Sequence, residues 1–220
     1  MLSSSKSQPN STPSVTGWTL LGMLSFEEEA SAYDLKKWID WTIDLYYGSP
    51  AYSQIYSELK KLESLGLVGS RVDRAEATRS RRLYKITEAG MAAVTDWANT
   101  APIDPLVVKN SALLRVTFGH LGSSAKLKDL LQEHVSDVED RYHKAVADAE
   151  AARGEPAWAY SMLALRWAAK FYEAQREFAL ELMKDLDEAD EIVERAVKGG
   201  SGKPRGTPGY WREITPGREL

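Results

Sequence analysis

The order of short segments in the first hundred residues is the feature that most constrains the fold of this chain. Helices are predicted over 15–25, 31–47, 50–64 and 89–98, and strands over 67–72 and 82–86. Apolar residues recur at three- and four-residue spacing in the amphipathic helices, whereas a polar, turn-like stretch separates the two strands. The expected order is therefore three helices, a β-hairpin and a fourth helix.

Capping and helix-stopping residues set the expected boundaries of these helices. Ser31, with Asp34 three residues later, is predicted to cap the second helix, and Thr87 is predicted to cap the fourth. Ser49 is expected to cap the third helix. Gly66 should end that helix, because glycine readily adopts the left-handed conformation that follows a helix C-terminus.

The hairpin is basic, although the chain as a whole has 28 Lys and Arg residues against 32 Asp and Glu residues. Residues 69–85 contain six basic side chains and two acidic ones. Three helices, a basic hairpin and a further helix form the order of a winged helix-turn-helix, in which one helix enters the major groove and the wing contacts the DNA backbone. The predicted fold class is mainly α with a small two-stranded β wing, followed by a C-terminal dimerisation domain of long helices.

Residues that could contact double-stranded DNA lie on the third helix, on the helix before it and on the hairpin. They are Ser53, Gln54, Tyr56, Lys60 and Lys61, together with Lys36, Arg79, Arg81 and Arg82. Residues in the first half of the third helix are placed to read bases, whereas the lysines and arginines suit phosphates. Two alternatives stay open, since Tyr56 could pack in the core and the arginines could form a solvated hairpin tip. Tyr33 is expected in the core.

Two motifs resemble the PadR-type transcriptional regulators. One is Ile55-x-x-x-Leu59-x-x-Leu62-x-x-x-Gly66-Leu67-Val68, and the other is Tyr84-x-Ile86-Thr87-x-x-Gly90. The resemblance covers about residues 15–98, and the C-terminal half is similar to the longer PadR-like subgroup in its length and helical pattern. It implies a homodimeric DNA-binding repressor whose multi-helix C-terminal region forms the dimer. Some members of the family respond to small aromatic or multidrug ligands, but no motif for an effector pocket carries over to this chain.

Long helical segments dominate the second half of the chain. They are predicted over 106–118, 124–153 and 156–198. The second and third greatly exceed the usual length of about 11–12 residues, and such helices usually pack against a partner, so a homodimer is expected. Trp97, Trp158 and Trp167 could line a pocket for a small aromatic effector, although aromatic residues at helical spacing are more often core or interface residues.

Composition divides the chain into four segments. Residues 1–14 are rich in Ser, Pro and Asn and are expected to be disordered, and residues 199–220 are rich in Gly and Pro and are expected to be flexible. Between them we expect a winged helix-turn-helix domain over 15–100 and a helical dimerisation domain over 101–198. Two prolines between residues 100 and 105 mark the junction.

The residue types that metal sites and enzymes need are scarce. The chain has no cysteine, and His120, His134 and His143 lack the spacing of a shared metal site. No nucleotide-binding or nucleophile motif occurs, so we expect no enzymatic activity, cofactor or metal. The sequence has no apolar run long enough for a membrane span and no signal-peptide core, so a cytoplasmic location without membrane binding is expected.

Two functions from different classes fit these observations. The principal one is a sequence-specific transcriptional regulator, a dimeric repressor on a pseudo-palindromic operator that a ligand could release. The alternative is a winged-helix module for protein–protein interaction without DNA binding. The net charge of −4 favours this alternative, because it opposes approach to DNA.

Overall fold

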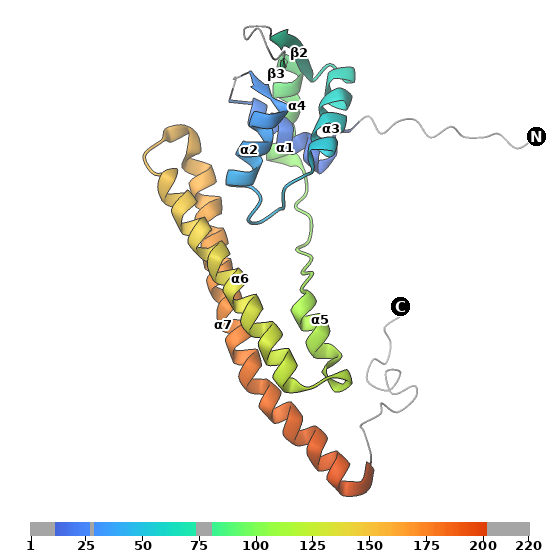
Figure 1. Ribbon diagram of the computed structural model, residues 1–220. Helices are drawn as coiled ribbons and strands as arrows, with labels where there is room; N and C mark the ends of the chain where they lie inside the picture. Colours follow the sequence, from blue (N-terminus) through green and yellow to red (C-terminus); the bar gives the residue numbers. More distant parts are fainter. Residues whose placement is uncertain (1–11, 27–28, 74–80, 202–220) are drawn as a thin grey trace, which may run out of the picture. The chain divides into compact units, whose positions relative to one another are not determined.

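The computed structural model describes residues 12–26, 29–73 and 81–201 (Figure 1). Their contacts divide them into two units. One contains the residues up to Leu106 together with Lys144–Ala168, and the other contains Val107–His143 together with the residues from Ala169 onward. The first unit holds the predicted winged helix and, in addition, residues 144–168 of the helical half.

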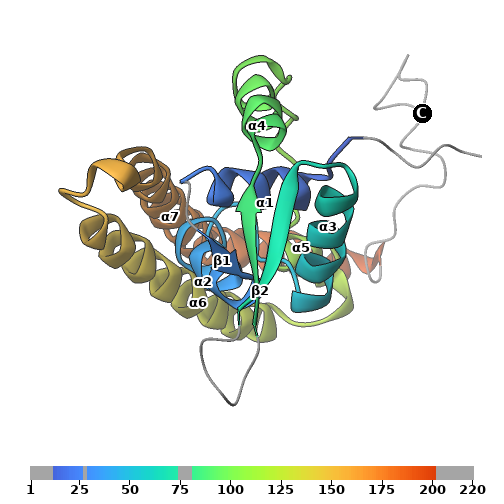
Figure 2. The same cartoon turned by 90° about the horizontal axis from the view of Figure 1, so that it is seen from above.

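The first unit has the predicted order of elements. They are α1 (Val15–Leu24), β1 (Ala30–Ser31), α2 (Ala32–Thr42), α3 (Tyr52–Ser64), β2 (Val68–Asp73), β3 (Arg81–Ile86) and α4 (Glu88–Thr100). The sheet, however, is antiparallel with three strands in the order β1-β3-β2, rather than the predicted two (Figure 2). The additional strand pairs Ala30 with Tyr84 and Ser31 with Leu83. Its two residues are too few to give an alternating pattern in the sequence.

The core of the winged helix forms where the apolar faces of its helices meet. Its fully buried side chains are Leu20, Leu21, Leu24, Leu35, Ile39, Ile55, Leu59 and Leu62. Burial of a leucine or isoleucine side chain contributes about 1.5–3 kcal/mol relative to exposure. Ile55, Leu59 and Leu62 form the buried face of α3, which fixes which of the remaining residues of that helix face outward.

The start of α2 is confirmed as a capping box. The hydroxyl of Ser31 accepts a hydrogen bond from the Asp34 N–H, and the Asp34 carboxylate accepts one from the Ser31 N–H. The predicted end of this helix at residue 47 is wrong, because α2 ends at Thr42. The hydroxyl of Thr42 donates to the Trp38 carbonyl, and the chain then continues in turns to Gly48, whose φ is +86°.

Ser49 does not cap α3 as predicted. The helix begins at Tyr52, with Ala51 as its N-cap, and the side chain of Gln54 accepts a hydrogen bond of 3.4 Å from the Ala51 N–H. The Ser49 hydroxyl instead donates to the carboxylate of Asp40 on α2. This tertiary partner lies nine residues away, beyond the reach of a capping pattern.

The second of the two motifs has a clear structural basis. Gly66 ends α3 with a φ of +71°, and its carbonyl accepts a hydrogen bond from the Thr87 hydroxyl. Thr87 also caps α4, as predicted, by accepting from the Gly90 N–H over 3.0 Å. Gly90 is buried so close to β2 that a Cβ there would lie 2.1 Å from the Leu67 carbonyl oxygen. Any side chain at this position would displace the backbone.

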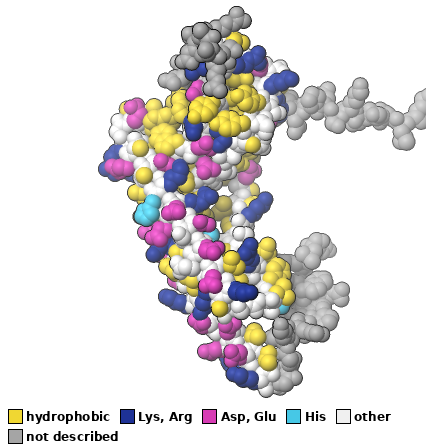
Figure 3. Space-filling model, viewed as in Figure 1, with side chains coloured by type: hydrophobic (Ala, Val, Ile, Leu, Met, Phe, Trp, Pro, Cys, Tyr) yellow, Lys and Arg dark blue, Asp and Glu magenta, His cyan; other side chains and the backbone are white. Residues whose placement is uncertain are grey.

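The helical half contains the predicted long helices with shifted boundaries. Its elements are α5 (Ser111–Thr117), η1 (Gly119–Leu121), α6 (Ser124–Ala151), η2 (Pro156–Trp158), α7 (Ala159–Ala196) and η3 (Val197–Ser201). The first helix was predicted from residue 106, but Asn110 caps it by accepting from the Ala112 and Leu113 N–H groups. Gly154, with a φ of +86°, lies in the turn between α6 and α7. Acidic and basic side chains are interspersed with apolar and other side chains on the visible face of the helical half (Figure 3).

Candidate nucleic-acid interface

The outward face of α3 carries most of the predicted DNA contacts. Its exposed residues include Ser53, Gln54, Tyr56 and Lys60. Tyr56 is 55% exposed, so the alternative that it packs in the core is wrong. Serine, glutamine and tyrosine offer hydrogen-bond groups to base edges and phosphates, and a lysine attracts phosphate. The geometry therefore presents donors and acceptors on the face opposite the buried Ile55, Leu59 and Leu62.

A second set of residues lies beside this face, and one of them, Lys36, is among the predicted DNA contacts. Tyr33, expected in the core, is 57% exposed, and its ring stacks on that of Tyr52 with centroids 6.4 Å apart and planes 9° apart. The ammonium group of Lys37 lies 5.5 Å from the Tyr33 centroid, and that of Lys36 lies 5.9 Å from the Tyr52 centroid. We call these four residues the tyrosine–lysine surface. The four-residue spacing of Tyr33 and Lys37 was the available signal, because it places them on one helix face.

Lys36 has an acidic partner, which reduces its availability to DNA. Its ammonium group donates to Asp40 Oδ1 and to the Ser49 hydroxyl, at 2.5 and 2.9 Å. Burial disfavours ionisation of the Asp40 carboxyl, but hydrogen bonds from Lys36 and Ser49 outweigh it, so the pKa of Asp40 lies below its usual range. The three side chains form a network that joins α2 to the segment before α3.

The arginines of the wing are also paired with carboxylates. Arg81 Nε lies 3.4 Å from Asp73 Oδ2, and Arg82 Nη1 lies 3.6 Å from Glu63 Oε2. Both arginine side chains are more than half exposed. Ion pairs of this kind contribute about 0–1 kcal/mol, so phosphate could replace the carboxylates at little cost. Arg79 lies outside the described residues.

Arg71, on β2, forms the most complete ion pair of the wing. Its guanidinium donates three hydrogen bonds to the carboxylate of Glu29, at 2.5–3.0 Å. Hydrogen bonds from Arg71 lower the pKa of Glu29, and the same contacts raise the pKa of Arg71. This bidentate contact links the wing to the residues just before β1, so Arg71 has a structural role here.

The two lysines at the end of α3 differ in their surroundings. Lys60 is exposed, whereas the Lys61 ammonium donates a hydrogen bond of 2.9 Å to the carbonyl of Thr12. Lys61 therefore holds the segment that leads into α1. Among the predicted phosphate contacts on α3, Lys60 is the better placed.

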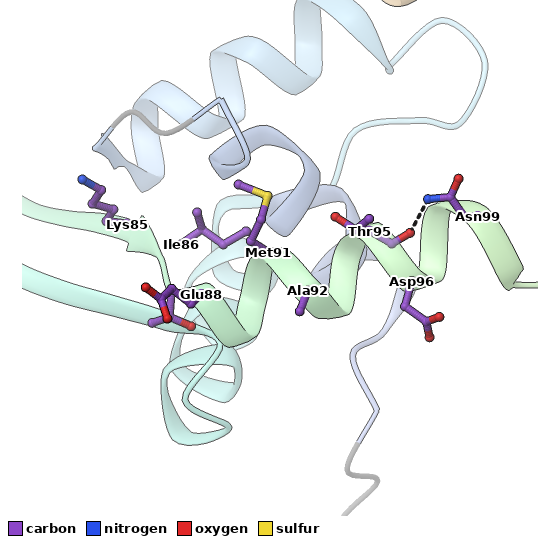
Figure 4. A pocket seen from close by; sticks show the side chains of 9 residues that line it. Lys85, Ile86, Glu88, Met91, Ala92, Thr95, Asp96 and Asn99 are labelled. Carbon is purple, nitrogen blue, oxygen red and sulfur yellow. Dashed lines mark hydrogen bonds between the residues drawn. The ribbon is translucent and has the colours of Figure 1, made fainter.

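Two of the tryptophans predicted for an effector pocket, Trp97 and Trp158, pack against different aromatic residues. Trp97 stacks on Trp18 of α1, with ring centroids 5.5 Å apart, and Trp158 packs against Phe26, Trp38 and Trp41. A cavity of about 900 Å³ runs along the end of β3 and one face of α4 (Figure 4). Its walls include Ile86 and Met91 with polar groups at the rim, and no tryptophan lines it.

Metal ligands and membrane-spanning helices are the two other features that bear on function. The residues that the structure describes contain no group of three or more His, Asp or Glu side chains that could hold a metal ion. Over the same ranges, no helix is both long enough and apolar enough to cross a membrane.

Known proteins are similar to this chain in sequence and in fold. Residues 20–96 match the transcriptional regulator PadR-like family. The negative transcriptional regulator PadR of Bacillus subtilis (strain 168) is 28% identical over 143 residues, which make up 62% of this chain and 78% of the relative. The crystal structure of Bacillus subtilis PadR in complex with operator DNA matches with a TM-score of 0.69 and 22% identity, over 79% of this chain and 99% of that chain. Its complex with p-coumaric acid gives a TM-score of 0.62 and 23% identity over the same shares.

These similarities agree with the motifs from which the family was first inferred. The matched range contains both motifs, together with α2, α3 and the wing. The family is one of transcriptional regulators, in line with the expectation that the chain is not an enzyme. Residues 20–96 of this chain therefore resemble the transcriptional regulator PadR-like family.

Proposed function

We propose that this protein binds double-stranded DNA through the outward face of α3, flanked by the tyrosine–lysine surface and the wing. The observation that carries the proposal is the exposure of hydrogen-bonding and cationic side chains on α3 within a PadR-like domain. Ser53, Gln54 and Tyr56 read bases or hold phosphates, and Lys36, Lys60, Arg79, Arg81 and Arg82 contact phosphates. The operator complex of Bacillus subtilis PadR, a relative of the same fold, supports this assignment.

The protein acts as a homodimer in this proposal, with residues 15–100 as the DNA-binding domain and 101–198 as the dimerisation domain. Large apolar side chains are exposed in the helical half, among them Leu121 at 77% and Leu114 at 59%. A second copy that covered such residues would remove apolar surface from water at a gain of about 25 cal/mol per Å². A two-fold dimer would present two copies of α3 to half-sites about 34–36 Å apart or a multiple of that distance.

Repression in the cytoplasm and release by a small aromatic ligand complete the proposal. The Bacillus subtilis relative is a negative regulator, and its complex with p-coumaric acid supports an aromatic effector for this chain as well. A dimer on a pseudo-palindrome would occlude a promoter. A ligand that favours another dimer geometry would then weaken binding by the ratio of its affinities for the two geometries.

The alternative of a protein-binding module without DNA binding has a specific observation in its favour. Arg71, Arg81 and Arg82 are paired with carboxylates in the free protein, so the described part of the wing is less positive than its arginine content implies. This alternative predicts little salt-dependent affinity for DNA.

The deciding experiment is retention of genomic fragments, including the protein's own promoter, at two salt concentrations. Specific, salt-sensitive retention with two chains per site would support the proposal, and a footprint would then give the half-site spacing. Each phosphate contact contributes about 0.9 to the slope of log K against log salt. Absence of retention at low salt would contradict DNA binding and favour the protein-binding alternative.

A further inference from the structure

Trp158, in the η2 turn between α6 and α7, lies among three aromatic rings of the winged helix. Its ring centroid is 4.9 Å from that of Phe26, 5.9 Å from that of Trp38 and 5.1 Å from that of Trp41. The contacts with the two tryptophans are edge-to-face, an arrangement that aromatic rings favour. Two of the three partners belong to α2, the helix that precedes the recognition helix α3.

A polar contact reinforces this aromatic one. Lys144, on the last part of α6, donates a hydrogen bond of 3.3 Å to the backbone carbonyl of Asp40. Its ammonium group is also paired with Asp148, one turn further along α6 at 2.6 Å. Asp40 lies between Trp38 and Trp41 in the sequence, so the polar and the aromatic contacts are made to the same turn of α2.

The side chain of Asp40 faces the segment that leads into α3. Its Oδ1 atom accepts hydrogen bonds from the Ser49 hydroxyl and from the Lys36 ammonium, both at 2.5 Å. Ser49 lies two residues before Ala51, the N-cap of α3. One residue of α2, Asp40, thus contacts Lys144 of α6 through its backbone carbonyl and the segment that leads into α3 through its side chain.

We infer that the hairpin tip, which we define as residues 144–158, is a positioning element for α3. Trp158 and Lys144 contact the last turns of α2 and restrict their movement. Asp40, on those turns, accepts a hydrogen bond from Ser49 and so restricts the segment that leads into α3. These contacts also belong to the unit that contains the winged helix, consistent with the grouping of residues 144–168 with it. The inference rests on the proposed function for its consequence in DNA binding, but the positioning of α3 itself does not.

Hydrogen exchange tests the positioning without DNA. The amides to follow are those of residues 55–59, which donate within α3. In Trp158→Ala, these amides should exchange about tenfold faster than in the wild type, because removing the ring weakens the hold on α2. Trp158→Phe keeps an aromatic ring and should restore most of the protection. Tyr160→Ala is the matched control, because Tyr160 lies two residues away and is highly exposed.

A double-mutant cycle on DNA binding tests the route through Asp40. Lys144→Met removes the contact with the Asp40 carbonyl, and Ser49→Ala removes the contact with its carboxylate. Each change should weaken specific binding by about threefold, and the double variant should lose less than the product of the two. The slope of affinity against salt should be unchanged, since neither residue is assigned to a phosphate. Variants that merely unfolded the domain would change the far-UV circular dichroism as well.

The outcomes separate the positioning role from DNA binding. Unchanged exchange over residues 55–59 in Trp158→Ala, or equal changes in Tyr160→Ala, would overturn the positioning role. Independent effects of Lys144→Met and Ser49→Ala would overturn the route through Asp40. Faster exchange in a protein that retains no DNA at low salt would support positioning while contradicting the proposed function.

Discussion

The hydroxyl of Ser70 donates a hydrogen bond of 2.5 Å to Glu63 Oε1, which joins strand β2 to the last turn of α3. The other carboxylate oxygen of Glu63 lies 3.6 Å from Arg82 Nη1 on β3. One acidic side chain therefore contacts both strands of the wing. The same carboxylate lies next to a guanidinium that we assign to DNA phosphate, so under the proposed function it would compete with DNA for Arg82 while it stabilises the wing.

Glu63→Gln separates these two effects. The amide oxygen of glutamine can still accept from Ser70, but the attraction to Arg82 and the negative charge are removed. We expect DNA affinity at low salt to rise by up to about fivefold, because an exposed ion pair contributes at most about 1 kcal/mol. Fluorescence anisotropy with a retained fragment measures this change. Glu133→Gln, on the exposed face of α6, is the control, and a loss of affinity in Glu63→Gln would contradict the competition.

Neutralising the wing should weaken binding without changing sequence preference. In the Arg81→Gln/Arg82→Gln double variant, affinity should fall for all sequences alike. The slope of log K against log salt should fall by about 0.9 for each phosphate that the wing no longer neutralises. Arg166→Gln, on α7, is the control for the loss of an arginine outside the proposed interface. If the slope of the double variant equals that of the wild type, the wing does not contact phosphate.

Gln54→Ala should instead change sequence preference. A side chain that reads a base contributes about 1–3 kcal/mol of discrimination at that position. Binding to the operator should therefore fall while binding to unrelated DNA is kept. The same change removes a weak hydrogen bond of 3.4 Å to the Ala51 N–H, so thermal unfolding should be measured in parallel. Equal losses on operator and unrelated DNA would show that Gln54 does not read a base.

Gly90→Ala should strongly destabilise the winged helix. A Cβ at this position would lie 2.1 Å from the Leu67 carbonyl oxygen, so β2 or α4 would have to move. We expect the free energy of unfolding to fall by about 3 kcal/mol or more, as it does in substitutions that severely disrupt a core. Gly22→Ala is the matched control, because a Cβ there meets no atom within 4 Å in α1. That control should be neutral or stabilising by up to about 1 kcal/mol in urea unfolding.

The hydrogen bonds that Asp40 accepts from Lys36 and Ser49 should make the stability of the folded protein fall at acid pH. Because hydrogen bonds hold the pKa of Asp40 below the ordinary value of 3.8, its stabilising contribution is complete above that value. The contribution is lost as the pH falls below 3.8 and through the folded-state pKa. The difference in Tm between wild type and Asp40→Asn should therefore be constant from about pH 6 to about pH 5 and shrink toward about pH 3. Asp185→Asn, on α7, controls for general charge effects.

The parts of the fold that the sequence predicts are those whose causes are local. Ser31 and Asp34 satisfy each other's backbone groups within one helical turn, and Gly66 stops α3 through its own conformational freedom. The strand β1 could not be placed, because its two residues are too few to give an alternating pattern. The start of α5 was placed too early although its cap, Asn110, is local. A tertiary partner decides the role of Ser49, since its hydroxyl binds Asp40 and not the helix that follows it.

The candidate site was predictable in position but not in its charge pairing. Periodicity identifies which face of α3 is outward, because Ile55 and Leu59 must be buried. It gives no sign that Arg82 meets Glu63, or that the ring of Tyr33 stacks outside the core on Tyr52. Such contacts join residues from different elements, and a sequence pattern describes one element at a time.

The hydrogen bond from the Lys61 ammonium group to the Thr12 carbonyl has a practical consequence for work with the protein. It brings the entry of the chain into α1 next to the C-terminal half of α3. An affinity tag or fluorescent label fused ahead of this point would be tethered beside the helix assigned to the major groove. Binding constants should therefore be measured after proteolytic removal of such a tag, and an N-terminal label would serve as a proximity reporter for bound DNA.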